Sequence, residues 1–324
     1  MILVKKSKVK FIFYIFLSVI YGYIFTLIPH FYFKDRVNYL SYAENYDFFL
    51  YLKSDVSFLT SEFFFLYINK FLSLFFVPEN IVYFFVFFIN FTLCFLFLSY
   101  GRKTVLPLLG ILAFFLMPFG FSYQLGSLRQ SFAVSLFLFS IYYIKNVNLL
   151  LICISVLLGL IHTSFLLVIP FLVADYIFLK FFSDRDLFYR LTLQLLVALF
   201  IGLLLSIISA IFSVEKMGSY LESESGLGWF FLFFIPFLIV NIYRYYINKK
   251  IDYISFLSIV GIIIYIVFYF ITPISGRIIT IFLPFIFLSL INKVNPINMW
   301  LLVYSILIGS WLFYNESYLA IMTI

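Results

Sequence analysis

Charged residues are scarce in this chain of 324 residues: Asp, Glu, Lys and Arg together make up 11% of it. A soluble domain carries about 25% charged residues, and a surface much poorer in charge would aggregate in water. Hydrophobic residues make up 65% of the chain, so lipid is the solvent that suits it. The composition therefore excludes a soluble globular protein and predicts an integral membrane protein.

Cysteine and histidine are also rare, with two residues of each type. Cys94 and Cys153 both lie inside apolar runs, where a thiol usually behaves as a small buried hydrophobe. The sequence contains neither a disulfide framework nor the ligand spacing of a metal site. We therefore expect no metal and no cofactor.

Long apolar runs are what the chain has in abundance. A helix needs about 20 apolar residues to cross the hydrocarbon core, so this length allows about twelve crossings with short connections. The runs cover residues 11–29, 63–77, 80–100, 104–121, 129–144, 147–161, 163–179, 191–213, 229–247, 253–271, 277–291 and 297–314. We predict an all-α, polytopic integral membrane protein with 11–12 transmembrane helices and a single transmembrane domain over residues 1–324.

The positions of Lys and Arg predict the orientation. Residues 5–10 carry four lysines and precede an apolar run that resembles a signal sequence, but no small-residue cleavage site follows. We interpret this run as an uncleaved first helix with a cytoplasmic N-terminus. With the other basic connections on the same side, 14 of 21 Lys and Arg but only 4 of 14 Asp and Glu are cytoplasmic. The longer polar stretches 30–62 and 214–228 are then outer loops.

The net charge of +7 has the same explanation. Basic cytoplasmic loops give many membrane proteins a positive charge. No basic run here is long enough to indicate binding to nucleic acid, so we expect no nucleic-acid partner.

The run 63–77 is the weakest predicted span. It follows Glu62 and carries Asn69 and Lys70 in its middle. A charge at the bilayer centre costs about 2.5–3.5 kcal/mol. A full crossing here would also move every later basic loop to the outer side. We therefore predict that this run is re-entrant or lies along the outer interface, which leaves eleven full spans.

Two arginines occupy matching positions at the outer ends of predicted helices. Arg129 lies between Ser127 and Gln130, which have the Ser-x-x-Gln spacing of a capping box. Arg277 likewise follows a serine by two residues and precedes an apolar run. Backbone N–H groups, the positive end of a helix dipole and a guanidinium attract phosphate, so the two sites could clamp a diphosphate. The alternative is that each arginine snorkels to lipid headgroups.

The remaining candidates are a histidine and the carboxylates of the first outer loop. His162, at a joint between two predicted spans, could act as a general base or donate to a phosphate. The alternative is a buried imidazole that is hydrogen-bonded to a loop carbonyl. Asp35, nearest the membrane, is the second catalytic candidate, and Glu44, Asp47 and Glu62 are secondary candidates.

Several short elements occur in an order that is typical of one family. They are Asp35-Arg36-Val37-Asn38-Tyr39, Glu62 before an aromatic run, Leu128-Arg129-Gln130-Ser131-Phe132-Ala133, Ile141-Tyr142-Tyr143-Ile144-Lys145, Leu160-Ile161-His162-Thr163-Ser164, and Gly276-Arg277-Ile278 leading to Leu283-Pro284. In these elements the chain resembles the EpsG-like family of bacterial exopolysaccharide and O-antigen polymerases, the Wzy type. The stretch 185–270 shows no signature, so the sugar specificity cannot be read.

The resemblance implies a hexosyltransferase-like, metal-independent polymerase at the periplasmic face of the bacterial inner membrane. It would transfer the growing glycan from undecaprenyl diphosphate to an incoming lipid-linked repeat unit. Arg129, Gln130 and Arg277 would bind the diphosphate, and His162 or Asp35 would activate the attacking hydroxyl. The expected partners are undecaprenyl-diphosphate-linked oligosaccharides, membrane lipids, and a flippase and chain-length regulator.

Three other functions remain open from the sequence. A lipid-linked oligosaccharide flippase should show related halves and polar residues near the bilayer middle, whereas the polar residues here gather at one face. A metal-dependent lipid-linked glycosyltransferase would use Asp35 with another carboxylate, and an acyltransferase is a related possibility. The third is a non-catalytic assembly partner.

Overall fold

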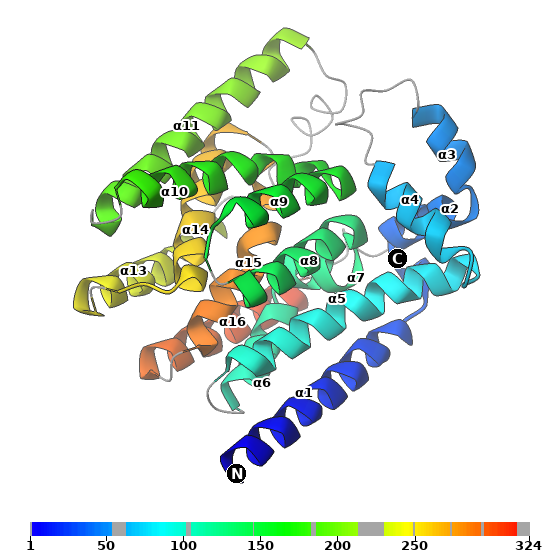
Figure 1. Cartoon of the computed structure of the whole chain (residues 1–324), viewed down its shortest axis with the longest axis horizontal. Coiled ribbons are helices and arrows are strands. Elements are labelled where there is room, and N and C mark those ends of the chain that lie inside the picture. The colour runs from blue at the N-terminus through cyan, green and yellow to red at the C-terminus, as the bar shows by residue number, and fades with distance from the viewer. Residues whose placement is uncertain are drawn as a thin grey trace.

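The structure is a computed structural model that describes residues 2–53, 63–101, 105–144, 146–182, 186–212, 230–248, 250–272, 274–292 and 295–315. All elements in these ranges are helices, which confirms the predicted all-α class. In chain order they are α1 (Ile2–Thr26), the 3-10 helix η1 (His30–Tyr32), α2 (Lys34–Glu44), α3 (Tyr46–Lys53), α4 (Phe63–Leu72), α5 (Pro78–Tyr100), α6 (Val105–Phe115), α7 (Pro118–Leu125), α8 (Leu128–Ile144), α9 (Leu149–Ile161), the 3-10 helix η2 (Thr163–Leu167), α10 (Ile169–Phe181), α11 (Leu187–Phe212), α13 (Phe230–Asn248), α14 (Tyr253–Ile271), α15 (Ser275–Ile291) and α16 (Pro296–Tyr314). Figure 1 shows the long helices running between two ends of a bundle.

Seven helical segments in the described ranges are long and apolar enough to cross a membrane. They are Lys8–Thr26 in α1, α5, Thr163–Phe181 (η2 with α10), Leu187–Ile207 in α11, α13, α14 and α16. Three further predicted spans are shorter apolar helices, with 17 residues in α8 and α15 and 13 in α9. At 1.5 Å per residue these helices are about 20–26 Å long, against about 30 Å for the hydrocarbon core. The chain is thus polytopic, with spans of unequal length.

The predicted span 104–121 is not one straight helix, because α6 and α7 meet at an angle of 90°. Pro118 begins α7, at a helical position where a missing N–H costs no hydrogen bond. A Cβ atom on Gly120 would lie 1.8 Å from the carbonyl oxygen of Phe114, so this close approach requires glycine. The bend turns α7 out of the line of α6.

Helices α1 and α5 lie side by side in opposite directions. The ring of Phe11, early in α1, is 5.8 Å from that of Phe95, late in α5. His30, just after α1, is 6.4 Å from Tyr83, early in α5. The segment between these helices therefore begins and ends at the same end of the bundle. Helix α4, with ten residues and a length of about 15 Å, is too short to cross, which confirms that the run 63–77 is not a full span.

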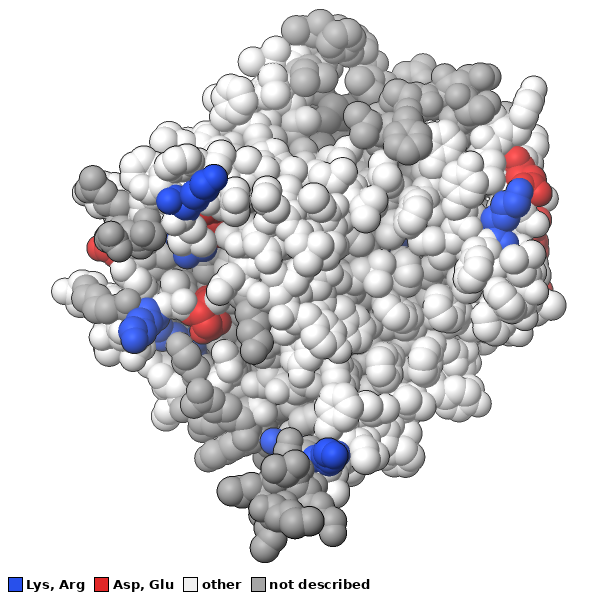
Figure 2. Space-filling view, in the orientation of Figure 1, with Lys and Arg blue, Asp and Glu red and all other residues white. Residues whose placement is uncertain are grey.

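Charged side chains gather toward the ends of the bundle and leave an apolar band between them (Figure 2). We call the end that holds α2, α3, α4 and the N-termini of α8 and α15 the loop end. The opposite end, which holds Lys10, Lys180 and Lys250, is the basic end. Lys70, whose charge argued against a span, pairs at the loop end with Asp47, with 2.8 Å between Nζ and Oδ1.

The interior is a continuous apolar cluster with members in all the long helices. Two hydrogen bonds inside this cluster join α1, α5 and α7. The Tyr21 hydroxyl of α1 donates to Gln124 Oε1 of α7 at 2.5 Å, and Asn90 Nδ2 of α5 donates to the Gln124 carbonyl at 3.1 Å. Because a buried polar group is costly unless it is hydrogen-bonded, these contacts favour one register of α1, α5 and α7.

Candidate functional site

Arg129 lies in the first turn of α8 and is surrounded by aromatic rings. Its guanidinium carbon is 5.6 and 5.3 Å from the ring centres of Tyr39 and Tyr42 in α2, and 5.9 Å from that of Phe65 in α4. Aromatic faces at these distances attract a cation. We call these three residues the aromatic cage. Arg129 is therefore held by protein side chains, unlike an arginine that snorkels to lipid headgroups.

Asp35 belongs to the same region. It lies exposed in the first turn of α2, one turn before the cage residue Tyr39. Burial raises the pKa of the Tyr39 hydroxyl, Arg129 opposes this through its charge and a hydrogen bond, and the Asp35 carboxylate raises the pKa further. Tyr39 thus stays neutral at physiological pH, and Asp35 lies within electrostatic reach of the cage.

The N-termini of α8 and α15 adjoin. Gln130 Nε2 donates to the main-chain carbonyl of Arg277 at 2.5 Å, and the Gln130 side chain is buried. The predicted capping box is therefore wrong: the Ser127 N–H donates to the Ser122 carbonyl at 2.9 Å, and Gln130 reaches across to α15 instead. Arg277 is exposed in the first turn of α15. This contact brings the two arginine-bearing helix ends together.

Arg36 connects the loop end to the bundle. Its side chain is 0% exposed, with Nε donating to the Leu125 carbonyl at 2.7 Å and Nη1 to the Ile28 carbonyl at 3.0 Å. The guanidinium carbon lies 4.5 Å from the centre of the Phe33 ring. Burial lowers the pKa of Arg36 to about 10, so it remains a cation at neutral pH. Arg36 thereby joins α2, which carries two of the cage residues, to the ends of α1 and α7.

His162 forms the joint between α9 and η2. The imidazole is buried, with Nδ1 2.6 Å from Ser164 Oγ and accepting from the Ser164 N–H at 3.4 Å. An Nδ1 atom that accepts leaves the imidazole proton on Nε2. Nδ1 of His162 thus faces Ser164, and the roles of phosphate donor and general base both stay predictions for this residue. Part of its role is structural, because Nδ1 contacts both the side chain and the main-chain N–H of Ser164 at the start of η2.

His162 lies on a joint that packs against the middle of α8. The ring of Phe165, in η2, is 5.6 Å from the ring of Phe137. Phe137 follows Arg129 by eight residues, or about 12 Å along the helix. The α9–η2 joint therefore lies deeper in the bundle than the cage.

The other predicted carboxylates are dispersed. Glu44 ends α2 and is exposed, and Asp47 is paired with Lys70. Glu62 and the predicted loop 214–228 lie outside the described residues. In the part of the chain that the structure describes, no three His, Cys, Asp or Glu side chains gather in a group that could hold a metal ion.

The aromatic cage and the buried position of Arg36 were missed in the sequence. Tyr39 and Tyr42 are three residues apart, which places them on one face of a helix, and this spacing could have indicated a shared role. The many other aromatic residues hid that signal. No sequence pattern indicated that Arg36 is buried, because an arginine in a polar stretch normally lies in water.

The assembled groups suit an anion with oxygen atoms. Two helix N-termini, each with an arginine in its first turn, meet at the loop end, and the exposed carboxylate of Asp35 lies near Arg129. Such donors stabilise negative charge, and phosphate in particular.

The sequence was also compared with known proteins. The family model described as the EpsG family matches residues 15–320, which is nearly the whole chain. No curated protein and no solved structure matches.

Proposed function

The chain belongs to the EpsG family, a family of Wzy-like polysaccharide polymerases. On this basis we propose that it extends glycan chains on a lipid carrier. Its spans make it a polytopic membrane protein. The proposed donor is a growing glycan on undecaprenyl diphosphate, and the acceptor is a lipid-linked repeat unit of an O-antigen or exopolysaccharide. The reaction is proposed to need no metal ion.

The observation that carries this proposal is the meeting of the two helix N-termini that bear Arg129 and Arg277. The contact from Gln130 to the Arg277 carbonyl holds them together. A diphosphate leaving group gains negative charge as its bond to the sugar breaks. Preorganised donors at that position stabilise the transition state more than the ground state.

The chemistry divides between the leaving group and the nucleophile. The acceptor hydroxyl oxygen forms a bond to the anomeric carbon, and the bond from that carbon to the diphosphate oxygen breaks. Undecaprenyl diphosphate leaves with the bonding electrons, next to Arg129 and Arg277. The hydroxyl proton passes to a carboxylate, for which we propose Asp35, because His162 Nδ1 already accepts from Ser164. His162 Nε2–H would then donate to a substrate oxygen.

The same proposal includes the direction in which the site faces. Basic residues predominate at the end that contains the N-terminus, and in a bacterial inner membrane this end would be cytoplasmic. The loop end, with Arg129 and Arg277, would then face the periplasm. A chain-length regulator and a flippase would act beside it.

The decisive experiment distinguishes a polymerase from a flippase. In an O-antigen pathway, loss of a polymerase leaves repeat units on the outer leaflet, where the ligase still transfers one unit to the lipid acceptor. We expect deletion of this gene to leave core with a single repeat. The variant His162→Ala should give the same product, because a separate flippase still moves the repeat units to the outer leaflet. A bare core in the deletion strain, with an active ligase, would exclude the polymerase and favour the flippase.

A further inference from the structure

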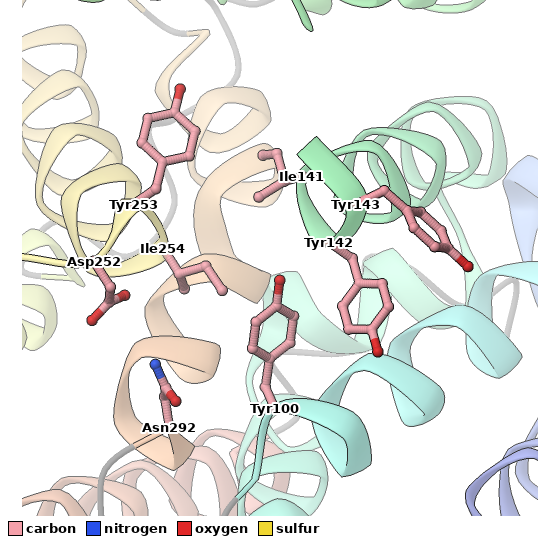
Figure 3. Close-up of a pocket in the computed structure, with 8 residues that line it drawn as sticks. All are labelled: Tyr100, Ile141, Tyr142, Tyr143, Asp252, Tyr253, Ile254 and Asn292. Atoms are coloured by element: carbon pink, nitrogen blue, oxygen red, sulfur yellow. The ribbon is translucent and has the colours of Figure 1, made fainter. Parts of the chain in front are cut away.

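An open pocket of about 520 Å³ lies at the basic end, far from the paired arginines. It is formed where α5, α8 and α15 end and α14 begins (Figure 3). The polar side chains in its wall include those of Tyr100, Tyr142, Asp252 and Asn292. The proposed transfer reaction uses none of them.

The pocket is rich in hydrogen-bond acceptors. Figure 3 shows Asp252 and Asn292 on one side of the space and Tyr142 on the other, with Tyr100 between them. The Tyr100 side chain lies within electrostatic reach of both Asp252 and Tyr142. A primary ammonium has three donors and no acceptor, so carboxylate, phenol and amide oxygens together match it. The Tyr100 and Tyr142 rings, with centres 5.5 Å apart, add faces that attract a cation.

Positive charge lies next to this acceptor wall. Lys250 precedes Asp252 by two residues, and the guanidinium of Arg244 is also within electrostatic reach of Asp252. Arg244 Nη1 donates to Asn241 Oδ1 and to the Ser289 carbonyl, both at 3.2 Å. Its buried Nη2 has no hydrogen-bond partner among the described residues. A ligand that places an anion beside its ammonium would satisfy both sides.

We propose that this pocket binds the headgroup of a phospholipid that carries a primary ammonium and a phosphate, as phosphoethanolamine lipids do. The pocket lies at the ends of α5, α8 and α15, beside the exposed Lys250, and helix ends are the depth of lipid headgroups in a membrane. The ammonium meets Asp252 and the tyrosine oxygens, and the phosphate lies toward Arg244 and Lys250. The site is independent of the proposed glycan transfer.

The variant Asp252→Asn removes the charge without removing the helix cap. Asp252 Oδ1 accepts from the Ser255 N–H at 2.9 Å and caps α14, and Oδ2 accepts from Ser255 Oγ at 3.0 Å. An asparagine Nδ2 can donate to the same hydroxyl oxygen. Asparagine caps helices as well as aspartate does. In this chain Asn148 and Asn295 already cap α9 and α16 through the same type of contact. The variant should therefore fold normally. Glu79→Gln, an exposed carboxylate at the loop end, is the matched control.

The test measures the melting temperature of the purified protein in detergent, with added lipids that share the same acyl chains. Phosphatidylethanolamine should raise the melting temperature of the wild type and of Glu79→Gln more than phosphatidylglycerol does. Phosphatidylcholine, whose headgroup nitrogen has no N–H donors, should be less effective. Soluble phosphoethanolamine distinguishes the headgroup alone from the whole lipid.

Asp252→Asn should melt at the wild-type temperature in detergent alone and lose the preference for phosphatidylethanolamine. An equal effect of phosphatidylglycerol on the wild type would overturn the proposal, as would an unchanged preference in Asp252→Asn. Either result would leave the glycan-transfer proposal untouched, because no residue of that site is changed.

Discussion

Arg36 and Arg129 are cations from neighbouring parts of the loop end that have different surroundings. Arg36 donates to two main-chain carbonyls in an interior position, whereas Arg129 is half-buried among the rings of the aromatic cage. A buried charge is tolerated only when hydrogen bonds replace the water that it has lost. Arg36 therefore positions α2, and α2 in turn places Tyr39 and Tyr42 around Arg129.

We expect Arg36→Lys to destabilise the protein and to reduce polymer formation. One ammonium cannot reproduce two hydrogen bonds from a planar guanidinium, and a hydrogen bond to a charged group contributes about 1.5–3 kcal/mol. The melting temperature in detergent and the polymer ladder measure the two effects. Val37→Ala, at an exposed neighbouring position, is the control that should change neither. A wild-type melting temperature for Arg36→Lys would show that the two hydrogen bonds contribute nothing.

Substitutions of Arg129 and Arg277 should both lower activity but should differ in their effect on stability. Arg129→Ala and Arg277→Ala should each lower the polymerisation rate by a factor of about 10²–10³, the typical cost of losing one preorganised donor. Lysine should restore little activity at either position, because it lacks the guanidinium fork. Only Arg129→Ala should also lower the melting temperature, since Arg277 is exposed. Near-normal polymer from well-expressed Arg277→Ala would reduce that residue to a lipid-facing anchor.

At the scale of elements, the bend between α6 and α7 and the short helix α4 shape the loop end. Both lie in runs that are apolar enough to suggest a crossing. Pro118 and Gly120 permit the bend, and the carbonyl of Leu125, the last residue of α7, accepts from Arg36. Helix α4 instead brings Phe65 to Arg129. The interrupted segments thus supply the surroundings of the candidate site, while the long helices support it.

Gly120→Ala should therefore alter the candidate site at the loop end, although Gly120 is not part of that site. Its Cβ would lie 1.8 Å from a main-chain oxygen, which cannot move without opening the bend. Overfilling of a well-packed interior typically costs about 1–3 kcal/mol. Gly202→Ala is the matched control, because its Cβ would be 3.2 Å from the flexible end of Ile271. A lower melting temperature and less polymer are expected only for Gly120→Ala, and equal behaviour of the two variants would contradict this account.

At the scale of the whole molecule, the bundle has chemically different ends. The loop end carries the paired arginines and the aromatic cage. The basic end carries the open pocket. Because helices long enough to cross a membrane run between them, the two ends face opposite sides of the membrane.

Labelling of single cysteines in intact spheroplasts tests this orientation. In a variant without Cys94 and Cys153, a cysteine at Asp47 should react with an impermeant thiol reagent. Cysteines at Asn146 and Asn248 should react only after permeabilisation, because the positive-inside rule places them in the cytoplasm. A cysteine at Ser219 tests the predicted second outer loop in the same way. Reversed labelling would place the arginine pair in the cytoplasm and overturn the periplasmic reaction.

The class of the protein follows from composition alone, because scarce charge and long apolar runs admit only a lipid environment. The weakness of 63–77 as a span was also evident, since one lysine in a short run is costly at the bilayer centre. Both predictions depend on local chemistry, which a sequence displays directly.

The contacts of the candidate site depended on tertiary structure. The Ser127 and Gln130 spacing predicts a local cap, yet Gln130 donates to a carbonyl 147 residues away. The burial of Arg36 and the aromatic cage likewise arise from elements that are distant in the chain. A side chain with several possible partners takes the one that folding brings within reach, and only the arrangement of the helices decides which partner that is.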